Sequence, residues 1–148
     1  MKSKLLKFLM VALGFGAYTS SDSPDMYGCP NADYVFNVDI VDNENDAPIE
    51  GIRVSVVQRY ITNELNNVDT LATGLTSAEG KVRLQYGSFP TNQHELVADD
   101  IDGAENGSYD SASVVVTTNS DDYTDGEGWY NGTATTEVTL KLNKSAEE

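Results

Sequence analysis

One short acidic segment, 99–107 (DDIDGAENG), holds the carboxylates best suited to bind a metal ion. Asp100 and Asp102 stand two residues apart, and a glycine after them permits a sharp bend. A Ca²⁺ ion takes about six to eight oxygen ligands, which carboxylates and an amide can supply. The spacing does not match an EF-hand loop, and acidic turns without a metal are commoner. Against that plainer alternative, the segment predicts a calcium site with the ligands Asp99, Asp100, Asp102 and Glu105.

A second acidic segment, 121–127 (DDYTDGE), has the same ambiguity. Its carboxylates would complete a site with the first segment if the fold brought both loops to one end of the domain. Nearby stand Trp129 and Tyr130, with Tyr109 and Tyr123 close to or within the two acidic stretches. Aromatic rings of this kind stack on sugar rings or peptides, and they equally cap the end of a core. Trp129 and Tyr130 are thus the candidate residues for ligand stacking.

Side chains suited to catalysis are few. His94 is the only histidine, and its place beside the start of an expected strand predicts a surface residue. The Gly-x-Ser-x-Gly elbow of α/β-hydrolases does not occur in the sequence. The 24 acidic residues offer many carboxylate pairs, which makes any single pair uninformative. The sequence therefore predicts that the protein is not an enzyme, with no catalytic residues and no cofactor apart from calcium.

Alternating apolar residues show which elements must position these groups. Apolar side chains alternate with polar ones in 34–40, 52–60, 82–86 and 138–142, and weaker strands are expected at 68–73, 95–99 and 111–118. Alternation with period two is typical of strands that bury one face. Loops rich in Asn, Asp and Gly separate these segments, and no sustained helical period follows residue 20. The pattern predicts an all-β fold, a single antiparallel β-sandwich of about seven strands.

The composition is strongly acidic. The 148 residues carry a formal charge of −15, with 24 acidic and 9 basic side chains. Such a surface repels the phosphates of nucleic acid and the headgroups of anionic lipid. Nucleic acid is therefore not an expected partner, and membrane attachment would need the N-terminal segment or a lipid anchor. A solvated surface is the commonest meaning of such an excess of acid.

The first twenty residues have the features of a signal peptide. Lysines stand near the start, a mostly apolar run covers 5–17, and small residues precede a polar stretch. The apolar run is shorter than the ~20 residues of a spanning helix. We expect a signal peptide at 1–20, a polar tether at 21–32, the sandwich domain at 33–143 and a frayed tail at 144–148. The predicted location is the periplasm, the outer membrane or the cell surface.

Cys29 is the only cysteine, so an intrachain disulfide is impossible. Lipid anchors are attached to a cysteine directly after the apolar run, where this sequence has Tyr18, Thr19 and Ser20. The spacing therefore argues against a lipid anchor. Cys29 is the candidate site for covalent modification, and a thiol without a role is the plainer interpretation.

Two short motifs resemble those of a known domain type. The motif 48–54 (PIEGIRV), followed by 76–80 (TSAEG) before a strand, resembles carboxypeptidase regulatory-like domains. Pro48 cannot donate a ladder hydrogen bond, and Gly51 permits a tight entry into the next strand. The resemblance implies a transthyretin-like (prealbumin-like) sandwich that is typically non-catalytic.

A second resemblance covers nearly the whole chain. The signal segment, 26–30 (MYGCP), 48–52 (PIEGI), 99–103 (DDIDG) and 129–132 (WYNG) resemble the radical SAM-associated lipoproteins of Gram-negative bacteria. This resemblance implies an exported protein whose gene lies near that of a radical SAM enzyme. It implies no catalytic mechanism for the protein itself.

The sequence as a whole predicts an exported, non-enzymatic binding or structural protein of the cell envelope. An envelope protein or a glycan would be its partner. Two alternatives stay open. One is a substrate of the radical SAM enzyme, altered at Cys29 or at a loop residue. The other is a calcium-stabilised module that binds carbohydrate or peptide.

Overall fold

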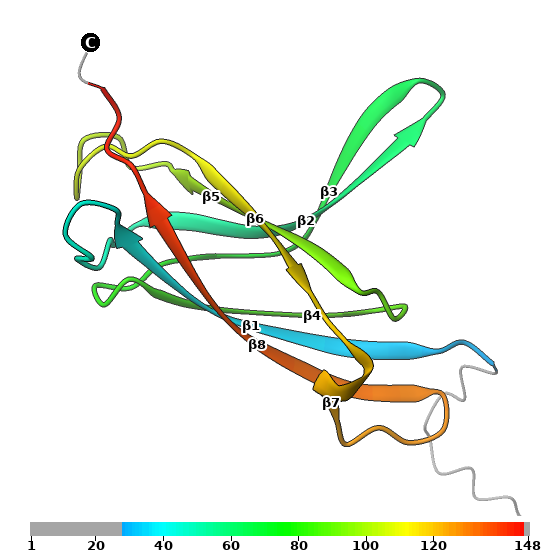
Figure 1. Cartoon of the computed structure of the whole chain (residues 1–148). Helices are drawn as coiled ribbons and strands as arrows, with labels where there is room; N and C mark the ends of the chain where they lie inside the picture. Colours follow the sequence, from blue (N-terminus) through cyan, green and yellow to red (C-terminus); the bar gives the residue numbers. More distant parts are fainter. Residues whose placement is uncertain (1–27, 147–148) are drawn as a thin grey trace, which may run out of the picture.

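The computed structural model describes residues 28–146. In this range two four-stranded sheets form a β-sandwich (Figure 1), which confirms the predicted fold class. The strands are β1 (Asn31–Asp42), β2 (Ile52–Thr62), β3 (Leu65–Leu75), β4 (Lys81–Ser88), β5 (Gln93–Asp100), β6 (Ala112–Thr117), β7 (Tyr123–Thr124) and β8 (Tyr130–Leu142), with one 3₁₀ turn, η1 (Ser120–Asp122), before β7.

The first sheet has the strand order β4-β1-β8-β7, and the second has the order β3-β2-β5-β6. Neighbouring strands are antiparallel except β1 and β8, which run parallel from Asn31↔Tyr130 to Asp42↔Leu142. The prediction of a wholly antiparallel sandwich is therefore wrong for this one pair. After β6 the chain crosses back to the first sheet, forms the short edge strand β7, and then returns as β8 beside β1 and in the same direction as β1. Alternation along a strand shows which of its faces is buried, but it does not show which strand pairs with it.

The core forms between the inward faces of the two sheets, as the alternation predicts. In β1 the alternate residues Tyr34, Phe36, Val38 and Ile40 are at most 1 % exposed. The second sheet contributes equally buried side chains from its two central strands: Ile52, Val54, Val56, Leu96 and Ala98. Burial of such apolar surface is the main favourable contribution to folding.

The two glycine-containing motifs lie side by side and are joined by hydrogen bonds to the backbone and hydroxyl of Thr76. Gly51 has φ +80°, a conformation that favours glycine, which confirms its predicted role in the turn. The buried Thr76 hydroxyl accepts a hydrogen bond from the Ile52 N–H at 3.0 Å and donates one to the Ile49 carbonyl at 2.7 Å. Backbone groups of the first turn are thereby satisfied by the second motif.

The paired ends of β2 and β3 extend beyond the sandwich as a two-stranded ribbon (Figure 1). We call residues 58–69 the arm. A β-bulge begins it, because Val56 pairs with Ala72 while Val57 pairs with Thr70. A tight turn ends it, with Asn63 at φ 51° and Glu64 at φ 67°. Beyond Val57, β2 no longer pairs with β5.

Several boundaries differ from the expected ones. Strand β1 begins at Asn31, inside the predicted tether, and Ala32 is already buried. Strand β8 begins at Tyr130, inside a stretch expected to be a loop. In the tail predicted to fray, the Ser145 N–H donates to the Ser108 carbonyl at 2.9 Å, so this residue is held.

No helix within residues 28–146 is long and apolar enough to cross a membrane. The predicted signal peptide lies outside the described residues.

Candidate ligand-binding pocket

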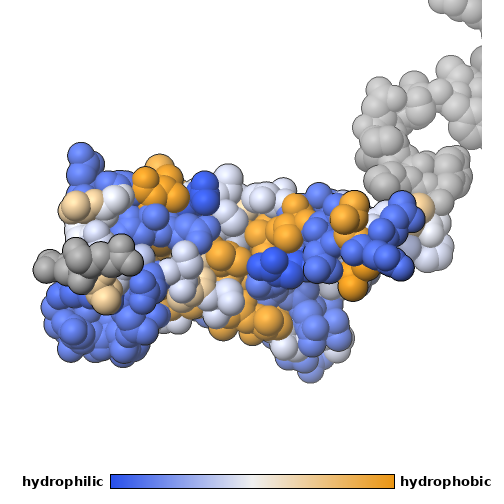
Figure 2. Space-filling model, turned by 90° about the horizontal axis from the view of Figure 1, so that it is seen from above, coloured by the Kyte–Doolittle hydropathy of each residue, from blue (hydrophilic) through white to orange (hydrophobic). Residues whose placement is uncertain are grey.

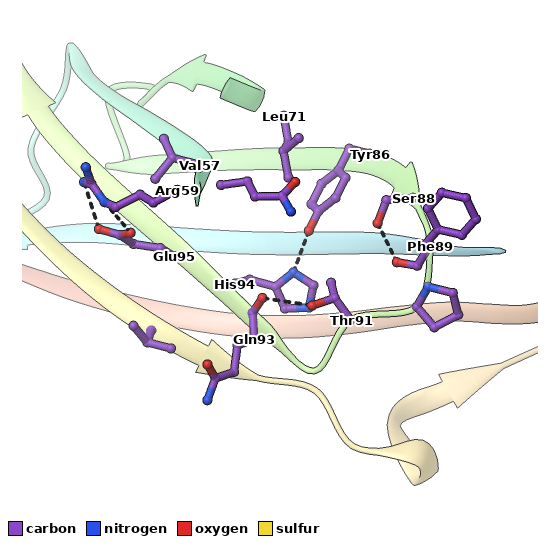
Figure 3. Close-up of a pocket in the computed structure, with 13 residues that line it drawn as sticks. Val57, Arg59, Leu71, Tyr86, Ser88, Phe89, Thr91, Gln93, His94 and Glu95 are labelled. Carbon is purple, nitrogen blue, oxygen red and sulfur yellow. Dashed lines mark hydrogen bonds and ion pairs between the residues drawn. The ribbon is translucent and has the colours of Figure 1, made fainter. Parts of the chain in front are cut away.

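A cavity of about 490 Å³ lies where the arm leaves the sandwich (Figure 3). Five strands and the β4–β5 loop contribute to its wall, so residues distant in sequence meet there. We call it the arm pocket. Its lining residues are Val57, Gln58, Arg59, Leu71, Tyr86, Ser88, Phe89, Pro90, Thr91, Gln93, His94, Glu95 and Val115.

His94 lies in the wall of the arm pocket and is only 2 % exposed. The sequence-based expectation of a surface histidine is therefore wrong, because strand β5 turns this side chain inward among aromatic rings. Burial lowers the pKa of His94 to about 4, and the Thr91 backbone only partly opposes this effect. The imidazole is consequently neutral near pH 7.

One hydrogen bond links the His94 ring to strand β4. The Tyr86 hydroxyl and His94 Nδ1 are 2.5 Å apart (Figure 3), and this hydroxyl has no other partner among the described residues. Nε2 is buried and has no hydrogen-bond partner within residues 28–146.

Aromatic residues hold the pocket wall and the β4–β5 loop in place. The ring centroids of Tyr34 and His94 lie 4.3 Å apart, and those of Phe36 and His94 lie 5.1 Å apart. The Tyr34 hydroxyl accepts a hydrogen bond from the Thr91 N–H at 2.7 Å and has the Thr91 carbonyl at 3.1 Å. The Tyr123 hydroxyl lies 2.9 Å from that of Tyr34, and burial raises the pKa of Tyr123. The loop is thus attached to the core by Tyr34.

An ion pair borders the arm pocket. Arg59 Nε donates to Glu95 Oε2 at 2.7 Å, and Arg59 Nη2 donates to Glu95 Oε1 at 3.0 Å (Figure 3). These bonds raise the pKa of Arg59. Because the two charges neutralise each other, the pocket presents apolar and neutral polar groups to a ligand rather than a net charge. That chemistry suits a neutral ligand of small size.

Exposed apolar side chains surround the same region. Phe89 is 66 % exposed and Val115 is 60 % exposed, and both line the arm pocket. In Figure 2 apolar surface gathers over the middle and right of the face shown, while the left end is largely hydrophilic. Four more exposed large apolar residues belong to the arm: Tyr60, Ile61, Leu65 and Val68. Large exposed apolar side chains gathered in one region of a soluble protein indicate an interaction site.

The structure places the four predicted calcium ligands on or after the end of β5. Asp99 pairs with Arg53 at 3.3 Å, and Asp100 accepts a hydrogen bond from the Tyr109 N–H at 2.9 Å. Burial raises the pKa of Asp100, and the nearby Asp102 carboxylate adds to the rise. Within residues 28–146 no three or more acidic, histidine or cysteine side chains are grouped as a metal site. The calcium site at Asp99, Asp100, Asp102 and Glu105 stays a prediction.

The two acidic loops lie at opposite ends of β1, so the idea that they share one site is wrong. The end of β1 meets the first loop, because the Tyr109 hydroxyl donates to Asp42 at 3.0 Å. The start of β1 meets the second, because the Asn31 N–H donates to the Trp129 carbonyl at 3.0 Å. A strand of this length separates its ends by about 35 to 40 Å.

The remaining candidate residues lie at the start of β1. Trp129 is 62 % exposed, whereas Tyr130 is half-buried and its hydroxyl donates to Asp33 at 2.8 Å. Only Trp129 of the two therefore presents a free ring, and ligand stacking stays a prediction. Cys29 is a free, half-buried cysteine two residues before β1.

Comparisons with known proteins give low similarity. No protein-family model and no curated protein matches the chain. Among solved structures, the Bacillus cereus major pilin subunit BcpA matches with a TM-score of 0.47 and 12 % identity, over 77 % of this chain and 31 % of that one. The group B streptococcus pilus 2b backbone protein matches at 0.43 and 18 %, over 74 % and 40 %. (S)-allantoin synthase matches at 0.41 and 13 %, over 78 % and 44 %.

The chain thus spans less than half the length of each of these proteins. The group includes both structural subunits and an enzyme. Similarity at this level assigns neither an activity nor a partner.

Proposed function

We propose that the protein is an exported, non-enzymatic binding protein of the cell envelope, and that it holds its ligand in the arm pocket. The observation that carries this proposal is the cavity of about 490 Å³ beside a projecting arm with exposed apolar side chains. Soluble proteins rarely leave a hollow and an apolar surface together without a partner. Export is supported by the signal-like residues 1–20 of the sequence.

The chemistry of the pocket favours binding over turnover. Its histidine is neutral near pH 7, and both ring nitrogens are shielded from solvent by burial. General acid–base catalysis needs a group whose pKa lies near the working pH and which reaches the substrate. The pocket's other ionisable side chains at its border, Arg59 and Glu95, are engaged with each other.

The test is NMR of the isotope-labelled domain in the presence of peptide and oligosaccharide fractions from the envelope of its native host. We expect amide shifts to concentrate at Leu71, Phe89 and His94. The variant Phe89→Ser should lose them, because it removes an exposed ring of the wall without opening the core. Leu75→Ser, at an exposed position of β3 outside the pocket, is the matched control and should keep them. Shifts elsewhere, or none with any fraction, would refute the proposal.

The family resemblance supports a second candidate, a substrate of an associated radical SAM enzyme with Cys29 as the modified residue. Cys29 is free and stands outside the core at the start of the domain, where an enzyme can reach it. The intact mass of the protein purified from its native host shows whether Cys29 is modified. We expect added mass that disappears in Cys29→Ser, with its size separating a lipid from a smaller group. A mass that equals signal-peptide cleavage alone would exclude any modification of Cys29.

A further inference from the structure

Strand β2 has a free backbone edge along the arm. It pairs with β5 only from Ile52↔Asp100 to Val57↔Glu95. Its pairing with β3 continues much further, to Thr62↔Leu65 at the tip. On the β5 side, residues 58–62 have no strand partner and no other backbone hydrogen bond within the described part of the chain.

The geometry of the arm shows which backbone groups face this edge. The turn has two residues, Asn63 and Glu64, so the closing pair Thr62↔Leu65 is a hydrogen-bonded pair. Hydrogen-bonded and non-hydrogen-bonded pairs alternate along an antiparallel ladder. Tyr60 therefore directs its N–H and C=O toward β3. Arg59 and Ile61 direct theirs toward the free edge.

Nothing in the sequence of 58–62 (QRYIT) protects the edge from pairing. Soluble proteins guard such edges with lysines, prolines or inward charges. The one charge here, on Arg59, is already tied to Glu95. Ile61 is 75 % exposed, and the neighbouring Tyr60 is exposed too. The free edge also begins at the arm pocket, since Gln58 and Arg59 belong to both.

We propose that an extended segment of a partner polypeptide adds to β2 as a new strand along residues 58–62 and places one apolar side chain in the arm pocket. This rests on the proposed function and names the class of ligand. An extended backbone carries donors and acceptors at the spacing that Arg59 and Ile61 require, and a sugar chain does not. Side chains of an added strand alternate between the two faces, so one would meet Leu71, Tyr86 and Phe89 in the pocket.

The charge of the protein favours a segment of another protein over a second copy of this chain as the occupant of the edge. Each copy carries a formal charge of −15, so two copies repel each other. The segment is accordingly neutral or basic, and it belongs to another protein. Pairing of two arms would instead make a symmetric dimer.

The test uses a displayed library of random peptides as the probe and hydrogen exchange as the readout. A selected peptide should slow exchange of the Arg59 and Ile61 amides about tenfold or more, while the Tyr60 amide, already in the β3 ladder, changes little. Ile61→Pro removes an edge N–H without touching the β3 ladder and should weaken binding roughly tenfold. Ile61→Thr keeps that N–H and is the matched control, with a much smaller loss.

Each of the following results would overturn the inference. A peptide that shifts pocket residues but leaves exchange at Arg59 and Ile61 unchanged would refute strand addition and leave the proposed function standing. Binding of an oligosaccharide alone would assign the pocket to a glycan. Protection of these amides that rises with protein concentration and without peptide would show a second copy at the edge. Failure of every probe to bind would refute both proposals.

Discussion

The imidazole of His94 makes stability depend on pH. Its pKa is lowered from 6.5 in the unfolded chain to about 4 in the folded protein, chiefly by burial. Between these values the unfolded chain binds a proton that the folded protein does not. The free energy of unfolding should therefore fall as the pH decreases from about 6.5 to about 4, and this contribution should be flat above 6.5.

Urea unfolding at several pH values between 7 and 4.5 measures this dependence. The variant His94→Gln removes the titrating group, so its free energy of unfolding should vary less across the window. Burial raises the pKa of Asp100, whose effect has the opposite sign, but both proteins share it and the comparison cancels it. An equal slope in the two proteins would mean that the pKa of His94 is the same in the folded protein as in the unfolded chain.

At the scale of the element, the turn of the arm carries backbone strain. Glu64 has φ 67° and Asn63 has φ 51°, and this region is costly for residues other than Gly, Asn and Asp. A two-residue turn with two positive φ values favours Asn-Gly. Glu64→Gly should raise the free energy of unfolding by roughly 0.5 to 1 kcal/mol.

Thermal or urea unfolding of Glu64→Gly beside Asn63→Gly tests this. Asparagine already tolerates the left-handed region, so Asn63→Gly should stabilise the protein much less. Because the turn lies at the tip of the arm, neither change should disturb the core. A loss of stability in Glu64→Gly would show that its side chain makes contacts worth more than the strain.

Strands with large apolar residues could be predicted, and those without them could not. Tyr34, Phe36, Val38 and Ile40 alternate clearly, and they form the core of β1. The first half of β8 has small or polar residues instead, so Gly132 and Ala134 are buried there without an apolar pattern. The two-residue β7 is too short for any period.

The candidate pocket was beyond prediction for a related reason. Leu71, Phe89 and His94 come from different strands and a loop, and their meeting depends on the order of strands in the two sheets. Alternation shows the buried face of each strand but not that order. The burial of His94 follows from the same packing of strands. Its neighbours in sequence are polar, so the sequence alone indicates a surface position.

At the scale of the whole molecule, negative charge is distributed rather than gathered. The acidic segments 99–107 and 121–127 stand at opposite ends of β1, and the ion pairs of the outer surface are mostly exposed. Exposed pairs contribute little to stability. The acidic surface therefore concerns solubility and the choice of partner more than the fold.

The parallel pairing of the first and last long strands decides how the molecule responds to mechanical tension. The chain enters β1 at the Asn31–Tyr130 end of this pair and leaves β8 at the Asp42–Leu142 end. A pull on the two ends of the domain therefore acts along the strands in opposite directions. Such shear loads the hydrogen bonds of the β1–β8 ladder together instead of opening them one at a time. A domain tethered at one end and pulled at the other would therefore resist unfolding.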